Sequence, residues 1–204
     1  IILEEAVRAK VKKLCFSSSC AVYGENPISP KIENIELDPK SPYAVSKLAG
    51  EYYCKIFSEM NKLQTVCLRY FNVFGERQSP TGAYAAAVPI FISNAKRNTP
   101  LIIYGNGEQT RDFIYVKDVV KANLFFAQND LQGVYNIGYG SNISIKKLAE
   151  QIIKATNSYS KIEYISKKDG EIIDSLSSVS KLKGTGFSFD HNFNSGLINT
   201  IKSF

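Results

Sequence analysis

The sequence predicts an α/β protein with a parallel sheet in its first part and a second region of mixed structure. Short apolar runs alternate with stretches that carry apolar residues at helical spacing. Segments rich in Gly, Pro and polar residues separate these runs, and no internal repeat or low-complexity tract interrupts them. Strand, helix and strand in succession imply parallel strands that are joined by right-handed crossovers.

The first elements give the order helix, strand, loop, helix. Residues 3–13 predict a helix that leads into a strand over residues 14–17, where the chain becomes rich in Ser. Residues 24–42 predict a loop. Ser41 is a suitable N-cap and Pro42 a favoured first residue for a second helix, which we expect to end near Asn61. Its apolar residues recur at helical spacing, at Val45, Ala49, Tyr52, Ile56 and Met60.

The rest of the chain continues this alternation. Thr65–Tyr70 contains β-branched residues between polar turns and predicts a buried strand. After Asn72, several Gly and Pro residues predict a loop. We then expect strands at 101–104, 113–116, 134–137 and 162–165, and helices at 90–97, 117–128, 144–157, 179–183 and 195–204.

Composition limits the classes of function. The chain has 204 residues, 44% of them hydrophobic, and no apolar run approaches the roughly 20 residues that cross a bilayer. We therefore expect a cytoplasmic protein with no membrane contact. The net charge is +6, but the basic residues are scattered, so a solvated surface is a better reading than a nucleic-acid site. The four cysteines form no CxxC pair and there is one histidine, so we expect reduced thiols and no metal site.

Tyr43 and Lys47 are the first candidates for chemistry. Residues four apart lie on one face of a helix, so the phenol and the ammonium can point into one cleft, where the cation favours the phenolate. This pair alone is a weak signal, because both residue types are common on helix surfaces. Ser17, Ser18 and Ser19 follow the strand upstream, at the edge where open α/β sheets bind ligands. A serine there can hydrogen-bond the oxygen from which the tyrosine takes a proton.

Three motifs together resemble the extended short-chain dehydrogenases, specifically the UDP-hexose 4-epimerases. They are residues 16–24, FSSSCAVYG, residues 41–47, SPYAVSK, and residues 68–75, LRYFNVFG. Residues 82–89, 104–107 and 110–113 add further matches, so the resemblance covers nearly the whole chain. It implies the carboxyl-terminal part of a Rossmann-like, doubly wound parallel sheet, with NAD as resident cofactor. It further implies an NAD-binding domain at 1–73 and 113–138, and a nucleotide-sugar-binding domain at 74–112 and 139–204.

The resemblance also implies roles for individual residues. Tyr43 would be the catalytic base, Lys47 its modulator and a ligand of the nicotinamide ribose, and Ser19 the partner of the sugar 4-hydroxyl. Ser17, Tyr70 and Phe71 would line the cofactor site. The expected UDP-sugar ligands are Asn72 and Arg111 at the diphosphate, Ala86 and Tyr104 at the uracil, Glu171 at the ribose, and Lys168, Gln78 and Ser175. Lys168 departs from the family pattern, because it stands where an arginine is usual.

The glycine-rich turn that receives the NAD pyrophosphate in this family has no match, since Gly24 is the first glycine. We therefore expect about a hundred residues of family pattern to be missing before Ile1, and this piece alone to bind NAD poorly and to be inactive. The resemblance also implies a homodimer through residues 2–13 and the helix that starts at Pro42.

Two alternatives remain open. The first is a nucleotide-sugar 4,6-dehydratase or decarboxylase, although these generally place an acidic residue where this chain has Cys20 and Ala21. The second is a non-catalytic nucleotide-binding protein of the same fold, which has no need of Ser19, Tyr43 and Lys47 together. Within the epimerases, Ser175 stands where a small side chain admits an N-acetylated sugar. Gln78 could offer the acetamido group a polar partner, so we expect conversion of UDP-N-acetylglucosamine at least as well as UDP-glucose.

Overall fold

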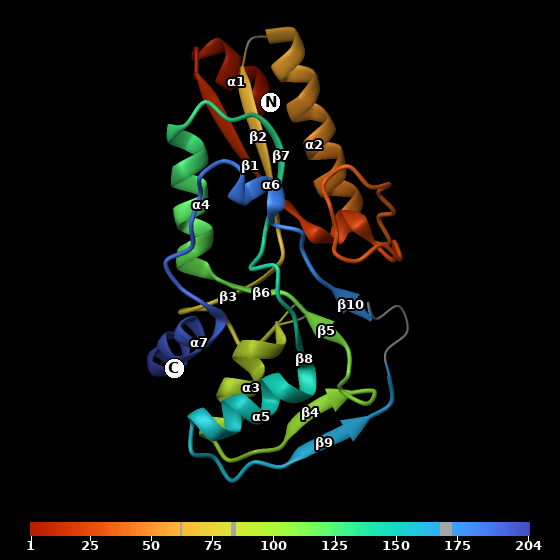
Figure 1. Ribbon diagram of the computed structural model, residues 1–204, viewed down its shortest axis with the longest axis vertical. Coiled ribbons are helices and arrows are strands. Elements are labelled where there is room, and N and C mark those ends of the chain that lie inside the picture. Colours follow the sequence, from red (N-terminus) through yellow and green to blue (C-terminus); the bar gives the residue numbers. More distant parts are fainter. Residues whose placement is uncertain (62, 83–84, 168–172) are drawn as a thin grey trace.

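In the computed structural model, a parallel three-stranded sheet forms the upper half of the molecule (Figure 1). The structure describes residues 1–61, 63–82, 85–167 and 173–204. β2 (Gln64–Tyr70) is the central strand and pairs with β1 (Lys13–Ser19) on one side and β7 (Gly133–Ile137) on the other. The predicted α/β class with parallel strands is confirmed. The carboxyl ends of these strands point toward the lower half of Figure 1, so residues that end β1 face the junction between the halves.

Helices cover both faces of this sheet. α2 (Pro42–Asn61) packs against β1 and β2 on one face, beside α1 (Ile2–Arg8), and α4 (Val116–Gln128) lies on the opposite face (Figure 1). α2 has the predicted limits. The Ser41 hydroxyl accepts a hydrogen bond of 3.1 Å from the main-chain N–H of Ala44, as an N-cap does.

α1 is shorter than predicted. We expected it to reach Lys13, but it ends at Arg8, because Lys10 has a left-handed backbone with φ 55°. The N–H of Val11 then donates to the carbonyl of Ala6 at 2.9 Å, which is the hydrogen bond of a Schellman end. β1 therefore begins at Lys13 itself.

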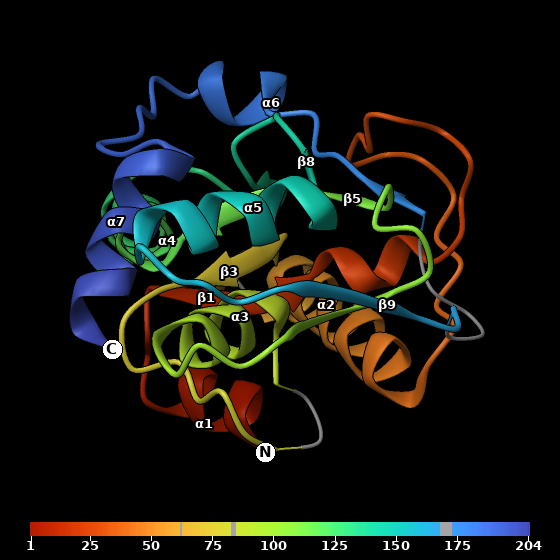
Figure 2. The ribbon, with the colours of Figure 1, turned by 90° about the horizontal axis from the view of Figure 1, so that it is seen from below.

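Small sheets and two packed helices form the lower half, and Figure 2 shows them in front of the upper sheet. The strands pair as β3 (Asn72–Phe74) with β6 (Phe113–Tyr115), β4 (Leu101–Tyr104) with β9 (Ile162–Ile165), and β5 (Thr110–Arg111) between β8 (Ile143–Ser144) and β10 (Asp174–Ser175). The helices of this half are α3 (Ala87–Lys96), α5 (Ile145–Ala155) and α7 (Phe193–Ser203). Two short elements lie beside the upper sheet, namely α6 (Ser180–Lys183) and the 3-10 turn η1 (Cys20–Tyr23) that follows β1.

The helix predicted at 90–97 starts earlier, at Ala87. Pro89 does not prevent this earlier start, because it lies in the first turn, where a main-chain N–H has no helical acceptor and proline is tolerated. No helix in the described part of the chain is both long and apolar enough to cross a membrane.

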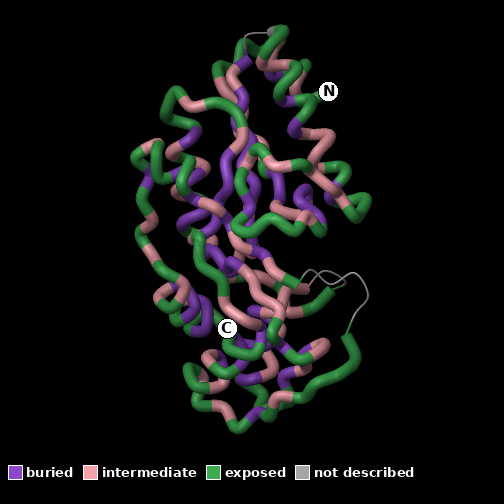
Figure 3. Tube along the Cα trace, turned by 45° about the vertical axis from the view of Figure 1, so that its right-hand side comes forward, coloured by how far each residue is buried: buried purple, intermediate pink, exposed green. Residues whose placement is uncertain are grey.

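Two apolar clusters support the two halves, and buried segments run through both in Figure 3. One cluster joins the upper sheet to α4 through side chains such as Leu68 and Phe126. The other fills the space between α3, α5 and β4 through side chains such as Ile92 and Leu148. Leu182 of α6 belongs to the upper cluster although it lies near the end of the chain. The division into two domains stays a prediction.

Candidate active site

The predicted base and its cation lie side by side at the end of β1. The Lys47 ammonium lies 5.6 Å from the centroid of the Tyr43 ring and donates a 3.0 Å hydrogen bond to the carbonyl oxygen of Ser17. Tyr43 is 54% exposed, and its phenol oxygen has no hydrogen-bond partner among the described residues. The helical spacing of Tyr43 and Lys47 thus brings both groups to the strand end, as expected.

Ser19 is the last residue of β1 and the N-cap of η1. Its side-chain oxygen accepts a 3.2 Å hydrogen bond from the N–H of Ala21. This bond uses a lone pair of the hydroxyl oxygen and not its proton. The O–H can therefore rotate and donate to a ligand.

Tyr70 and Phe71 support the same strand ends from inside the protein. The Tyr70 hydroxyl lies 3.0 Å from the Ser17 hydroxyl and donates to the side-chain carbonyl of Asn123 at 2.8 Å. Phe71 is buried beside Tyr23. Contact of Ser17, Tyr70 and Phe71 with a cofactor stays a prediction.

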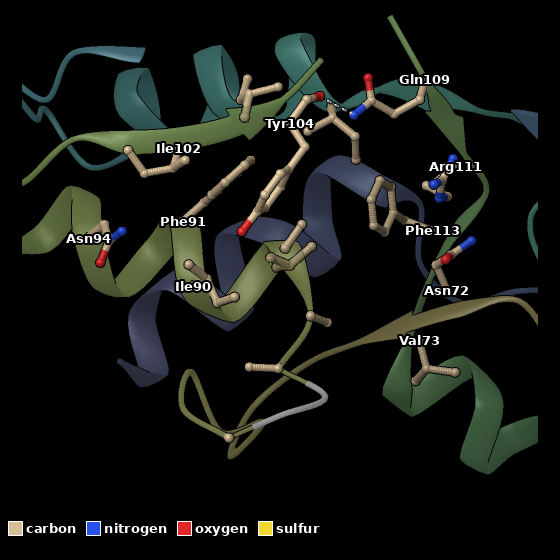
Figure 4. A pocket seen from close by; sticks show the side chains of 17 residues that line it. Asn72, Val73, Ile90, Phe91, Asn94, Ile102, Tyr104, Gln109, Arg111 and Phe113 are labelled. Atoms are coloured by element: carbon tan, nitrogen blue, oxygen red, sulfur yellow. Dashed lines mark hydrogen bonds between the residues drawn. The ribbon is translucent and has the colours of Figure 1, made fainter. Parts of the chain in front are cut away.

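A cavity of about 640 Å³ lies in the lower half, between α3, β4 and β5 (Figure 4). Four predicted nucleotide ligands, Asn72, Ala86, Tyr104 and Arg111, line it together. Most of its other walls are apolar, and Ile90, Phe91, Ile102 and Phe113 are among them. An apolar cavity with a few polar groups at one end suits a planar base joined to a charged group.

Asp112 holds the polar end of this cavity in place, and the sequence analysis did not identify it. Its main-chain carbonyl accepts 3.0 Å hydrogen bonds from both the main-chain N–H and the side-chain amide of Asn72. Its carboxylate accepts hydrogen bonds from the N–H groups of Tyr139 at 2.8 Å, Gly140 at 3.0 Å and Ser177 at 3.1 Å, and from the Ser177 hydroxyl at 2.5 Å. Burial raises the pKa of Asp112, and these hydrogen bonds offset part of that rise.

Ser175 lies between the two groups of candidate ligands. It is buried in β10, directly opposite Arg111 in the parallel register with β5, and its side chain lies close enough to the Cys20 thiol to lower the pKa of that thiol. Burial raises the pKa of Cys20 to about 11, so this thiol is protonated at neutral pH. The structure therefore brings Ser175 next to the residue that follows Ser19.

The remaining predicted ligands are less closely tied to the site. The side-chain amide of Gln78 donates to the carbonyl of Val73 at 3.2 Å, and no hydrogen bond among the described residues joins it to Ser175. Lys168 and Glu171 lie outside the described residues.

The donor and acceptor groups at the end of β1 fit the ribose of NAD. A ribose carries neighbouring hydroxyls, and Tyr43 offers them a half-exposed phenol. Lys47 has donors beyond the one that reaches Ser17, because an ammonium carries three N–H groups.

Residues 1–138 match the model of the NAD dependent epimerase/dehydratase family. This match covers more than half of the chain, so the protein belongs to that family, and the predicted NAD dependence and Rossmann-like fold are confirmed at this level.

Two solved structures show how far the similarity extends. The UDP-N-acetylglucosamine 4-epimerase from Methanobrevibacter ruminantium M1, in complex with UDP-N-acetylmuramic acid, is 43% identical with a TM-score of 0.94 over 99% of this chain. The UDP-glucose 4-epimerase of Thermotoga maritima with UDP-glucose is 33% identical with a TM-score of 0.95 over 99% of this chain. The chain spans 66% of the length of each.

The curated relatives include other reactions. Human dTDP-D-glucose 4,6-dehydratase is 36% identical over 80% of this chain, which spans 47% of the human protein. A relative from Methanocaldococcus jannaschii that carries the name of a UDP-glucose 4-epimerase is 37% identical over 96% of this chain, which spans 64% of that relative. Membership of the family therefore does not determine which reaction a protein catalyses.

Proposed function

We propose that this chain is the catalytic and substrate-binding part of an NAD-dependent 4-epimerase that acts on UDP-hexoses. The observation that carries the proposal is the placement of Tyr43 and Lys47 at the end of β1, with a nucleotide-sized cavity in the lower half. Two distinct places for a ligand are what a nucleotide sugar requires. One receives the reacting sugar carbon, and the other anchors the nucleotide.

Each side chain then has a separate task. Tyr43 takes the proton of the sugar 4-hydroxyl, Ser19 hydrogen-bonds the same oxygen, and Lys47 favours the phenolate and holds the cofactor ribose. NAD, held by Tyr43 and Lys47 through its ribose, would supply the hydride acceptor and donor that no side chain provides. Tyr43 returns the proton after the sugar has turned, which exposes its other face to reduction.

Binding to the nucleotide supplies most of the affinity, which leaves the sugar free to turn. Arg111 and Asn72 hold the diphosphate, because a forked guanidinium and an amide both donate to phosphate oxygens. Ala86 and Tyr104 hold the uracil in the apolar part of the cavity. Lys168 and Glu171 stay predictions as further ligands.

Cys20 favours epimerisation over dehydration or decarboxylation. In this family those reactions generally use a carboxylate directly after the serines, and here Cys20 and Ala21 occupy that stretch. Burial keeps the Cys20 thiol protonated at neutral pH, so it is a poor substitute for a carboxylate base.

A direct assay separates these reactions. The protein expressed from its complete reading frame is incubated with UDP-glucose and with UDP-N-acetylglucosamine, and the products are separated by chromatography. We expect the 4-epimers, with conversion of the acetylated sugar at least as fast. A 4-keto-6-deoxy sugar would show a dehydratase, and tight UDP binding without turnover would show a non-catalytic binding protein.

We also propose that the protein forms homodimers through α1 and α2. Tyr52, Tyr53, Ile56 and Met60 are large exposed apolar side chains that recur at helical spacing on α2. A continuous exposed apolar surface of this kind is typical of a protein interface. Light scattering on the purified protein tests the proposal, since Tyr53→Glu with Met60→Glu should convert the dimer to monomer.

A further inference from the structure

Glu51 and Arg69 form a buried ion pair between α2 and β2. The Glu51 and Arg69 side chains are 6% and 3% exposed. Arg69 donates two hydrogen bonds to the carboxylate, from Nε to Oε1 at 2.9 Å and from Nη2 to Oε2 at 2.7 Å. This two-pronged geometry fixes both the distance and the orientation of the two side chains.

Ser18 extends this pair to the strand that carries the catalytic serine. Its buried hydroxyl donates to Glu51 Oε1 at 2.5 Å, and Ser18 lies directly opposite Arg69 in the register of β1 and β2. One carboxylate on α2 is therefore held by donors from two neighbouring strands.

The same helix and the same strand carry the catalytic groups. Glu51 follows Lys47 by four residues and Tyr43 by eight, so all three lie along one side of α2. Ser18 stands between Ser17, whose carbonyl binds Lys47, and Ser19. A shift of Glu51 along the axis of α2 would move Tyr43 and Lys47 by the same amount relative to Ser19.

The energetics favour a positioning role over a stabilising one. Removing two charges from water is costly, and a buried ion pair often adds no net stability compared with apolar side chains of similar size. The best-supported role of a buried ion pair is to fix how two packed elements align with each other. Arg69 also donates to the main-chain carbonyl of Glu33 at 3.0 Å, so it ties the loop that leads into α2 to the same place.

We propose that Ser18, Glu51 and Arg69 are positioning residues that set the axial position of α2 against β1, and thereby the distance from Tyr43 and Lys47 to the reacting sugar. The inference rests on the proposed function, because it assigns these residues to the same site. They touch neither substrate nor cofactor and act through the catalytic side chains.

The chain offers a closely matched pair of variants to test this. Ser18→Ala removes the hydroxyl that reaches Glu51, whereas Thr65→Val removes another buried hydroxyl, which donates at 3.0 Å from β2 to the Cys54 carbonyl of α2. Both variants delete one hydrogen bond between α2 and the sheet, but Thr65 lies at the other end of β2 from Arg69.

Both variants are made in the protein expressed from its complete reading frame and loaded with NAD. We expect Ser18→Ala to lower kcat by about 10- to 100-fold, since misplacement by about 1 Å can cost a factor of this size. The KM and the affinity for UDP should stay within about twofold. Thr65→Val should keep kcat, and Ser18→Thr, which retains a hydroxyl, should recover most of the loss.

Hydrogen exchange over residues 46–52 gives a second readout that does not depend on turnover. Ser18→Ala should speed exchange there and Thr65→Val should not. Equal kcat losses in both variants, or none in either, would overturn the positioning role. If the wild-type protein converts no nucleotide sugar, the proposed function fails, and the exchange result alone decides: faster exchange confined to Ser18→Ala supports positioning, and unchanged exchange refutes it.

Discussion

The Lys47 ammonium donates a 3.0 Å hydrogen bond to the main-chain carbonyl of Ser17. Because the acceptor belongs to the backbone of β1, the lysine is held at the strand end whatever side chain occupies position 17. One ammonium thus links the helix that carries the predicted base to the strand that carries the predicted sugar ligand.

Tyr43→Phe should reduce turnover by roughly 100-fold or more, because the proton of the sugar hydroxyl then has no base to receive it. Affinity for UDP should be unchanged, since the nucleotide cavity lies in the other half of the molecule. Steady-state kinetics and calorimetric titration measure the two effects. Tyr53→Phe, another exposed tyrosine of α2, is the control and should keep full activity. Near-normal turnover of Tyr43→Phe would exclude this residue as the base.

Arg111→Ala should weaken UDP binding by about 2 to 4 kcal/mol, because a diphosphate would lose a charge-assisted fork. Calorimetric titration with UDP measures this loss directly. Arg8→Ala removes an exposed arginine of α1 and should leave the affinity unchanged. The same affinity in Arg111→Ala as in wild type would indicate a structural role for Arg111.

Ser175→Tyr should suppress conversion of UDP-N-acetylglucosamine more than that of UDP-glucose. The serine is buried beside Cys20 and Arg111, and in the proposed site a phenol ring at this position would take up the space next to the sugar. Ser175→Ala is the control, and it should retain both activities because it adds no volume. Equal loss on both substrates in the tyrosine variant would show that Ser175 does not select the sugar.

Asp174 should make the folded state sensitive to acid. Burial alone would raise its pKa, but hydrogen bonds from Ser29, Thr110 and Asn142 and the charge of Lys31 outweigh this, so the pKa lies below its ordinary value of 3.8. A depressed pKa stabilises the folded state above about pH 4, and this contribution is lost as the pH falls through the folded value. Urea unfolding at pH 7 and near pH 3 should show a smaller loss of stability in Asp174→Asn than in wild type. Equal losses would contradict the assignment.

Much of the upper half could be predicted because its signals are local. The Tyr43 and Lys47 spacing, the Ser41 cap and the apolar run of β2 each lie within a few residues, and each was found where expected. The small strands β3, β5, β8 and β10 were not predicted, because each is two or three residues long and contains a polar residue, which leaves no strand pattern. β6 is equally short, but Phe113–Tyr115 is apolar throughout and was predicted.

Contacts between distant segments could not be predicted either. Nothing in the sequence indicated the role of Asp112, whose carboxylate accepts hydrogen bonds from main-chain N–H groups that lie 27 to 65 residues away. The neighbourhood of Cys20 and Ser175 depends in the same way on β10 lying beside β5. Such partners follow from the topology of the chain and leave no local pattern.

The surroundings of Asp112 narrow the amino acids that evolution can place there. Within the described residues, the four groups that hydrogen-bond its side chain are all donors, so an asparagine would present its own N–H₂ to other N–H groups. A glutamate would push the carboxylate about one carbon further into a space already occupied by the main chain at 139–140 and 177. Aspartate is therefore the side chain that fits position 112, because its carboxylate accepts from all of these donors at the length that the surrounding main chain allows.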